Sequence, residues 1–210
     1  VNGEFYTREG PEGYMIKDGG NVVNGTRIST EDGAQYPFHG FFGILDNGTP
    51  IIGNYDEDWN QYKSALYQAT GSQYQVVANG TVSDFSNAIE CDTTDIDYDQ
   101  ETFYRYVSRH PRTAAGIKDG NKILLVTVDG RGYNGSVGVY IEELGRIMKF
   151  LGAADAINMD GGGSTTAAYY NDVTSTVDIL NTPSNTSGTP YQGKVLRTIF
   201  STVLIVVQEE

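Results

Sequence analysis

Apolar residues in the first part of the chain come in short runs that are separated by turn residues. The clearest runs are GYMIKDG (13–19), HGFFGILDNGTPIIGNY (39–55) and SQYQVVANGTVSDF (72–85). Each run contains Asp-Gly or Asn-Gly beside apolar or aromatic residues, which is the strongest short-range signal of a β-hairpin. The pattern therefore predicts antiparallel hairpins.

One segment in this part has a different spacing. In DEDWNQYKSALYQATG (56–71) acidic residues fill the first turn, a glycine closes the segment, and apolar residues recur every three or four positions, namely Trp59, Tyr62, Leu66 and Ala69. This spacing predicts a helix. We expect the aromatic stripe on this helix to belong to the core rather than to a ligand site.

The second part of the chain alternates strand-like and helix-like segments. RTAAGIKDGNKILLVTVDGR (112–131) predicts two strands joined at Asp119-Gly120. The second of these strands is apolar on both faces, so we expect it in the centre of its sheet. SVGVYIEELGRIMKFLGA (136–153) has helical spacing and a closing Gly152, which predicts a helix.

Two further strands complete the expected fold. DAINMDGG (155–162) predicts a strand, and VLRTIFSTVLIVV (195–207) predicts a long, buried strand after the polar loop NTPSNTSGTP (181–190). The chain shows no internal repeat and no linker. We therefore expect one α+β domain over residues 1–210, with a mixed, largely antiparallel β-sheet core and a few helices.

Charge narrows the class of ligand. The chain has 14 Lys and Arg against 27 Asp and Glu, a net charge of -13. This balance argues against nucleic acid and anionic membranes as partners, because no excess of basic residues is present to neutralise phosphates. A local basic site can still bind one phosphate group. No apolar run reaches about 18 residues, so no membrane insertion is expected.

Cysteine content and the first residues bear on the origin of the chain. Cys91 is the only cysteine, which excludes a disulfide or a cysteine zinc cluster made by this chain alone. VNGEFYTREG (1–10) lacks the features of a signal peptide and has no initiator Met. We expect a processed or truncated piece, part of a larger polypeptide or assembly.

Two kinds of signal leave alternatives open. Asn24-Gly25-Thr26, Asn47-Gly48-Thr49 and Asn79-Gly80-Thr81 are glycosylation sequons, but Asn-Gly is also a hairpin turn, and turn chemistry is the interpretation we favour. The acidic stretch ECDTTDIDYDQETFYRY (90–106) is either a cation-binding loop or a solvated surface segment. It lacks the spacing of an EF-hand, which favours the solvated segment.

Polar residues that can carry chemistry stand at the ends of apolar strands. They are Arg112, the triplet Asp129-Gly130-Arg131, and Asn158 followed by Asp160, three glycines and Ser164. Glycine lets the backbone approach a ligand closely, and successive N–H groups in such a turn can form an anion-binding nest. A tight corner between strands is the alternative explanation of the glycine run.

The same segments closely resemble the phosphodiester glycosidase family. The resemblance rests on RTAAGI (112–117), LLVTVDGR (124–131), Ser136-x-Gly138, Glu142-Glu143-Leu144 and LGAADAINMDGGGSTT (151–166), and extends more weakly to VNGEFY (1–6) and Arg197. Glu4 and Leu196 depart from the family's usual residues. The β structure that usually precedes Asn-Gly in the family is absent, so either a preceding segment completes the fold or this member is shortened.

The resemblance implies cleavage of a sugar-1-phosphodiester into a free sugar and a phosphomonoester. A phosphate leaving group is a weak base, so a cation that holds the diester matters more than a strong general acid. Arg112 and Arg197 suit that task, because a guanidinium group can bind two phosphate oxygens at once. Asp160 is the first candidate for the catalytic carboxylate and Asp129 the second.

The remaining candidates would bind or orient the substrate. Gly161, Gly162, Gly163 and Ser164 would donate hydrogen bonds to the sugar or the phosphate. Arg131 and Asn158 would either contact the substrate or orient Asp129 and Asp160. Asn2 would contribute if the N-terminal segment folds back over the site. His39, His110 and Cys91 lie outside the matched motifs and are not assigned a catalytic role.

The remaining expectations concern cofactor, partner and location. We expect no required metal, although the oxygen atoms of Asp129, Asn158 and Asp160 offer an alternative site for Ca²⁺ or Mg²⁺. The expected partner is a glycan or a sugar-phosphate small molecule, and the expected location is extracellular, on a cell surface or in a phage virion. The alternative function is a non-catalytic carbohydrate-binding or structural module of a cell-surface or phage tail assembly.

Overall fold

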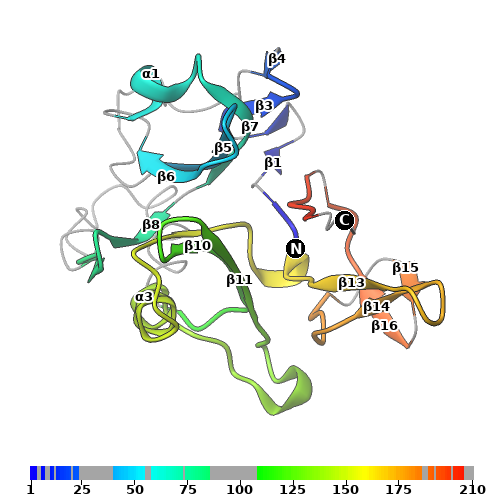
Figure 1. Cartoon of the computed structure of the whole chain (residues 1–210). Coiled ribbons are helices and arrows are strands. Elements are labelled where there is room, and N and C mark those ends of the chain that lie inside the picture. Colours follow the sequence, from blue (N-terminus) through cyan, green and yellow to red (C-terminus); the bar gives the residue numbers. More distant parts are fainter. Residues whose placement is uncertain are drawn as a thin grey trace.

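The computed structural model describes residues 1–3, 6–7, 10–11, 13–19, 21–23, 40–54, 58–72, 74–85, 108–185, 189–191, 193–199 and 201–205. Two five-stranded sheets and three separate two-stranded hairpins make up the β structure of these residues (Figure 1). All the strand pairs in this part of the chain are antiparallel. The predicted α+β class with a largely antiparallel core is confirmed.

The first sheet has the strand order β4-β3-β7-β5-β6. Its strands are β3 (Met15–Lys17), β4 (Asn21–Val23), β5 (Gly40–Leu45), β6 (Pro50–Asn54) and β7 (Leu66–Ser72). The β3–β4 and β5–β6 pairs are two of the predicted hairpins, and Asn47-Gly48 forms the turn of the second. A short pair, β1 (Tyr6–Thr7) with β2 (Gly10–Pro11), lies outside this sheet.

The helix predicted over residues 56–71 is largely wrong. Only α1 (Asp58–Tyr62) is helical, and Leu66–Ser72 form β7, between β3 and β5. The apolar spacing misled because Trp59, Leu66 and Ala69 do share one core, with Ile16 and Phe41. Gly71 and the β-branched Thr70 favour a strand over a helix. The aromatic side chains lie in the core as expected, since the Trp59 ring stacks on Tyr14 at 4.8 Å.

The second sheet has the strand order β11-β10-β12-β8-β9. Its strands are β8 (Tyr74–Ala78), β9 (Thr81–Val82), β10 (Arg112–Lys118), β11 (Lys122–Val128) and β12 (Asp155–Asn158). The predicted hairpins β8–β9, with its turn at Asn79-Gly80, and β10–β11 are confirmed. Strand β11, however, lies at the edge of the sheet, so the prediction that it is central is wrong.

Strand β11 is apolar on both faces because both faces of this sheet are covered. Leu124 and Val126 pack against the core beneath helix α3 (Ile141–Phe150), whereas Ile123 and Leu125 pack against the core shared with the first sheet. The central strand is β12, and β10 lies between β11 and β12. The small residues of β10 fit a crowded site, because a Cβ on Gly116 would stand 2.6 Å from Cε of Met148. Burial on both faces therefore does not identify a central strand.

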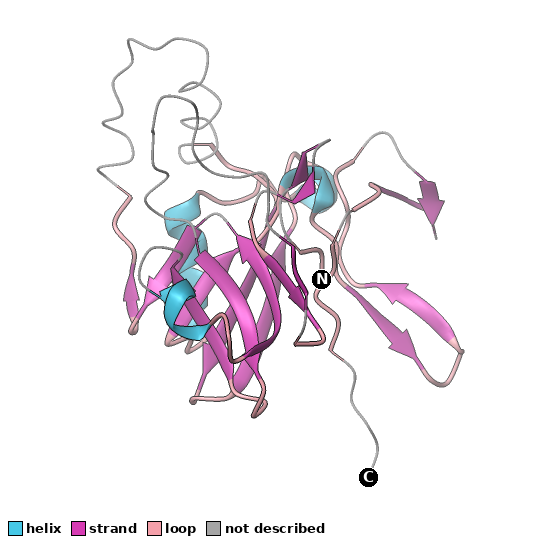
Figure 2. Cartoon of the chain, turned by 90° about the horizontal axis from the view of Figure 1, so that it is seen from above, coloured by secondary structure: helices cyan, strands magenta, loops and turns pink. Residues whose placement is uncertain are grey.

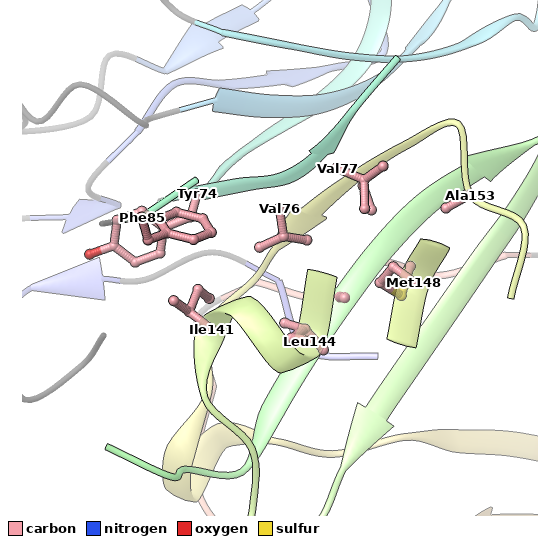
Figure 3. Packing of buried hydrophobic residues seen from close by; sticks show 10 residues of the cluster. Tyr74, Val76, Val77, Phe85, Ile141, Leu144, Met148 and Ala153 are labelled. Atoms are coloured by element: carbon pink, nitrogen blue, oxygen red, sulfur yellow. The ribbon is translucent and has the colours of Figure 1, made fainter. Parts of the chain in front are cut away.

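Helix α3 forms the third layer of the fold. It contacts β8, β9, β10 and β12, and its side chains Ile141, Leu144 and Met148 are buried against the second sheet (Figure 3). Gly152, at φ +93°, follows the helix as predicted. The order of layers is thus first sheet, second sheet and α3, and the strand ends of the middle layer lie between the other two.

The last part of the chain differs from the prediction. A hairpin of β13 (Ala168–Asn171) and β14 (Thr176–Ile179), which the sequence analysis missed, projects from the body, and β15 (Thr189–Tyr191) pairs with β16 (Lys194–Leu196) (Figures 1 and 2). The long buried strand predicted over 195–207 is wrong, because Leu204 and Ile205 are exposed. After β16, this segment pairs only with the first residues of the chain, within the described ranges.

Some sequence predictions lie outside the described residues. They concern the acidic stretch 90–106 with Cys91, the sequon at Asn24, and His39. Among the described residues, none of the helices has the length and apolar character needed to cross a membrane.

Candidate active site

The three polar motifs of the sequence meet at one end of the second sheet, where its strands begin or end. Arg112 begins β10 and pairs with Val128, the last residue of β11, so Asp129 follows at the same end of the sheet. Asn158 ends β12 opposite Ala114, and the N–H group of Met159 donates to the carbonyl of Thr113 at 2.8 Å. Continuing this register pairs Asp160 with Arg112, on the face of the sheet that α3 covers. The fold therefore brings together residues that lie up to 48 positions apart.

Arg112 is buried, with 4% of its surface exposed. Its guanidinium group donates to the backbone carbonyls of Val139 and Ser108, both at 3.3 Å. These two carbonyls belong to the segments just before α3 and β10, so Arg112 connects the beginning of the strand to the beginning of the helix. A buried cation at this place also provides positive potential opposite Asp160.

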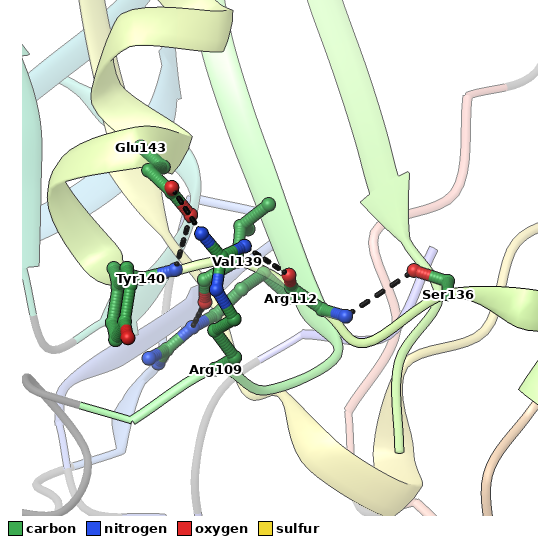
Figure 4. A network of polar contacts seen from close by, with 7 residues as sticks. Arg109, Arg112, Ser136, Val139, Tyr140 and Glu143 are labelled. Atoms are coloured by element: carbon green, nitrogen blue, oxygen red, sulfur yellow. Dashed lines mark hydrogen bonds and ion pairs between the residues drawn. The ribbon is translucent and has the colours of Figure 1, made fainter. Parts of the chain in front are cut away.

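A neighbouring network fixes the same corner (Figure 4). Arg109 donates to the carbonyl of Gly138 at 2.9 Å, forms an ion pair with Glu143 at 2.5 Å and lies over the Tyr140 ring at 4.5 Å. The other carboxylate oxygen of Glu143 accepts from the Tyr140 N–H group, which caps the helix. The network, which the sequence analysis did not single out, holds the acceptors of Arg112 in place.

Asp129 is engaged with the polar loop that begins at Asn181. Its Oδ1 atom accepts hydrogen bonds from Nδ2 of Asn181 and from the Thr182 N–H group, both at 3.0 Å. Oδ2 is also 3.0 Å from the Thr182 nitrogen. The Asn181 side chain in turn donates to the carbonyl of Thr165, next to Ser164. Asp129 thus orients the loop beside the glycine run, and its catalytic assignment stays a prediction.

The glycine run leaves room for two guanidinium groups. Residues Gly162–Ser164 form the 3-10 helix η3, in which Gly162 has a φ of +60°. A Cβ on Gly162 would stand 2.9 Å from Nη2 of Arg131, and a Cβ on Gly163 would stand 3.1 Å from Cζ of Arg197. Side chains at these two positions would displace both arginines. A tight corner is therefore not a sufficient explanation of the run.

Neither of these two arginines has a carboxylate partner among the residues that the structure describes. The ion pairs found there involve Arg109, Lys122 and Arg146. Arg197 has one hydrogen bond, at 3.4 Å to Oγ of Ser164, and Arg131 has none within the same ranges. The chain has an excess of 13 acidic residues. Two guanidinium groups without carboxylate partners therefore mark this end of the sheet as a candidate anion-binding site.

Asp160 and Gly161 join β12 to η3. Asp160 is half-buried, and its N–H group donates to the carbonyl of Gly3 at 2.9 Å. Gly161 has no room for a side chain, because a Cβ there would stand 2.8 Å from the carbonyl oxygen of Pro111. Asn2, with 1% of its surface exposed, donates from Nδ2 to the carbonyl of Asp160 at 2.5 Å. The first residues do fold back to this site, as the sequence analysis considered.

Asn158 is completely buried, and neither polar atom of its side chain has a hydrogen-bond partner among the described residues. It lies between Ala114 and Tyr74 on the face that carries Asp160. The hydroxyl of Thr165 and Nδ2 of Asn185 are also buried without partners there. Unpaired buried polar groups cost free energy and are rare in native proteins, so each calls for a water molecule or a ligand.

Replacing Asn158 with valine is expected to raise stability and to leave activity nearly unchanged. Each unpaired buried polar group costs about 1–3 kcal/mol, so the free energy of unfolding should rise by about that amount in urea titrations. Because the Asn158 side chain is completely buried and cannot touch a substrate, kcat/KM should stay close to the wild-type value. A less stable Asn158→Val variant would show instead that a bound water molecule satisfies the amide.

The three oxygen-bearing residues considered for a cation do not form a ready metal site. Within the described ranges, no group of three or more His, Cys, Asp or Glu side chains is placed to hold a metal ion. Both oxygens of Asp129 face N–H donors, which a cation would have to displace. The donor set therefore fits Ca²⁺ or Mg²⁺ poorly.

Comparisons with known proteins identify the family of the chain. A family model described as phosphodiester glycosidase matches residues 1–205. The N-acetylglucosamine-1-phosphodiester alpha-N-acetylglucosaminidase of Bos taurus is 32% identical over 171 residues, which cover 79% of this chain and 30% of the relative. The Mus musculus enzyme of the same name is 31% identical over 153 residues, 70% of this chain and 28% of the relative. The chain thus spans less than a third of the length of these relatives.

A solved structure shows the same fold. It is the catalytic domain of the zebrafish N-acetylglucosamine-1-phosphodiester alpha-N-acetylglucosaminidase, described as auto-inhibited by its pro-peptide. The TM-score is 0.64 at 24% sequence identity, and the match covers 94% of this chain and 59% of that one.

Proposed function

Because the chain belongs to the phosphodiester glycosidase family, we propose that it hydrolyses a sugar-1-phosphodiester to a free sugar and a phosphomonoester. One observation carries the proposal. The Arg131 and Arg197 guanidinium groups lie over consecutive glycines of η3 without a carboxylate partner in the described part of the chain. A diester phosphate is an anion that would match them.

The proposed reaction breaks the bond between the anomeric carbon and the phosphate oxygen. Water adds to the anomeric carbon, the electron pair of the broken bond stays on the phosphate, and the proton released by water leaves through a carboxylate. Asp160 is the residue proposed to take this proton or to stabilise the positive charge that develops on the sugar. Arg131 and Arg197 would hold the diester and stabilise the departing phosphomonoester.

The other residues have supporting roles in this proposal. Arg112, buried behind Asp160, keeps the carboxylate environment positive and fixes the strand end. The N–H groups of Gly161 and Gly163 are proposed to donate to the phosphate or the sugar, because those of Gly162 and Ser164 already donate to the carbonyls of Pro111 and Gly161. The Asn158 side chain is completely buried, so it is given no direct contact with the substrate. No metal is required in this scheme. The proposed substrate is a glycan or a small sugar phosphate, and the location outside the cell stays a prediction.

A panel of UDP-sugars and p-nitrophenyl phosphodiesters tests the proposal. Hydrolysis in ¹⁸O-labelled water should release free sugar and place the label on the sugar, because the carbon–oxygen bond is the one that breaks. Label on the phosphate would identify a phosphodiesterase instead. Binding of the panel without any release would support the carbohydrate-binding module. The rate should be the same after exhaustive chelation, and its loss would bring back the metal-dependent alternative.

A further inference from the structure

The first three residues, Val1 to Gly3, lie between the turn at Asp160 and residues 201–203. On one side, Val1 exchanges hydrogen bonds with Val203, at 3.0 and 2.8 Å, and Asn2 forms an isolated β-bridge with Thr202. The Gly3 N–H group donates to the carbonyl of Ser201 at 2.9 Å. These three residues are called the N-terminal strap below.

On its other side the strap holds both backbone polar groups of Asp160. The carbonyl of Gly3 accepts the Asp160 N–H group at 2.9 Å, and Nδ2 of Asn2 donates to the Asp160 carbonyl at 2.5 Å. Asp160 follows the last residue of β12 by two positions, and Gly161 comes directly after it. Since glycine restrains the backbone least, the strap supplies the restraint that the glycine run lacks.

The Asn2 side chain is itself fixed in one orientation. Its Oδ1 atom accepts from the hydroxyl of Thr113 at 2.7 Å and from the Thr166 N–H group at 3.1 Å. Thr113 belongs to β10, and Thr166 follows the glycine run. One buried amide therefore connects β10, the Asp160 carbonyl and the segment after η3, that is, both sides of the glycine turn.

We propose that Asn2 is the positioning residue for Asp160, and that it acts through the backbone rather than by touching the substrate. We assign Asn2 this indirect role rather than a direct contact with the substrate, because Asn2 is 1% exposed and its side chain already makes three hydrogen bonds to protein groups. It rests on the proposed function, in which Asp160 takes part in bond cleavage. A catalytic group displaced by about 1 Å can lose about a hundredfold in rate, so a slack turn would affect kcat more than substrate binding.

Two variants of Asn2 test the proposal. Asn2→Asp is nearly isosteric and keeps the acceptors for Thr113 and Thr166, but it removes the donor to Asp160. Asn2→Ala removes all three hydrogen bonds. The matched control is Ile16→Ala, which destabilises the separate core of the first sheet, far from these contacts. All four proteins are assayed well below their unfolding temperatures, and the exchange of the Asp160 amide proton is followed by NMR.

We expect kcat of both Asn2 variants to fall about a hundredfold with KM within threefold, and the Asp160 amide to exchange faster than in Ile16→Ala. Retained kcat, or an equal loss in the Ile16→Ala control, would overturn the assignment. So would unfolding of both Asn2 variants, because Asn2 would then support the whole fold. If the wild-type protein hydrolyses none of the panel, the proposed function fails, and amide exchange alone decides whether the strap holds Asp160.

Discussion

Asp160→Asn is expected to lower kcat by about 100- to 10,000-fold, the range of a general acid or base. The amide is nearly isosteric with the carboxylate, but it neither accepts a proton from water nor balances positive charge on the sugar. The backbone bonds of residue 160 to Gly3 and Asn2 do not involve the carboxylate, so the fold should survive. The measurement is kcat on the preferred diester, with thermal unfolding by circular dichroism beside it.

The matched control is Asp46→Asn, which removes an exposed carboxylate from the first sheet, away from the site. It should retain the kcat of the wild-type protein. An Asp160→Asn variant with wild-type activity would remove Asp160 from the mechanism. A variant that loses its fold would point instead to a structural need for the negative charge opposite the buried Arg112.

Arg131→Gln and Arg197→Gln are expected to weaken the use of charged substrates selectively. A hydrogen bond to a charged group contributes about 1.5–3 kcal/mol, so each variant should lose about 10- to 150-fold in kcat/KM on a phosphodiester. A neutral p-nitrophenyl glycoside of the same sugar has no phosphate for these arginines to bind, so its kcat/KM should change little. The ratio of the two kcat/KM values is the informative quantity.

Arg146→Gln is the control for these two variants, since Arg146 is an exposed arginine on α3 whose partner is Glu142. It should leave the ratio unchanged, because an exposed ion pair contributes little. Equal losses on the diester and on the neutral glycoside would contradict the assignment of Arg131 and Arg197 to the phosphate. In that case the buried Arg112 becomes the remaining guanidinium candidate.

Local sequence patterns predicted the α3 helix and the hairpins of the two five-stranded sheets well, but missed the β13–β14 hairpin. Asn47-Gly48 and Asn79-Gly80 encode their turns through the residues of the turn itself, and α3 has both a regular apolar face and a glycine stop. The errors arose where burial depends on distant partners. Leu66 and Ala69 of β7 continue the helical spacing that begins at Trp59, although they form a strand. Strand β11 is apolar on both faces although it is an edge strand.

The candidate site was partly predictable for the same reason. Each polar motif stands at the beginning or the end of an apolar strand, and the antiparallel register then places the motifs at one end of the sheet. The contacts within the site were not predictable from spacing. The Asp129 partners lie 52 and 53 positions away, in a loop that reads only as polar, and the Asn2 contacts span 111 to 164 positions. No local pattern reports such pairs.

The bridge between residues 1–3 and residues 201–203 has a consequence for biosynthesis of the chain. Residues 1–3 are made about 200 positions before their outer partners, Ser201 to Val203. Contacts so distant in sequence form late, whereas hairpins can form as they emerge. Both sheets can therefore be in place while the N-terminal strap still lacks its partners on one side. The proposed active site would be completed only after Ser201 to Val203 have been made.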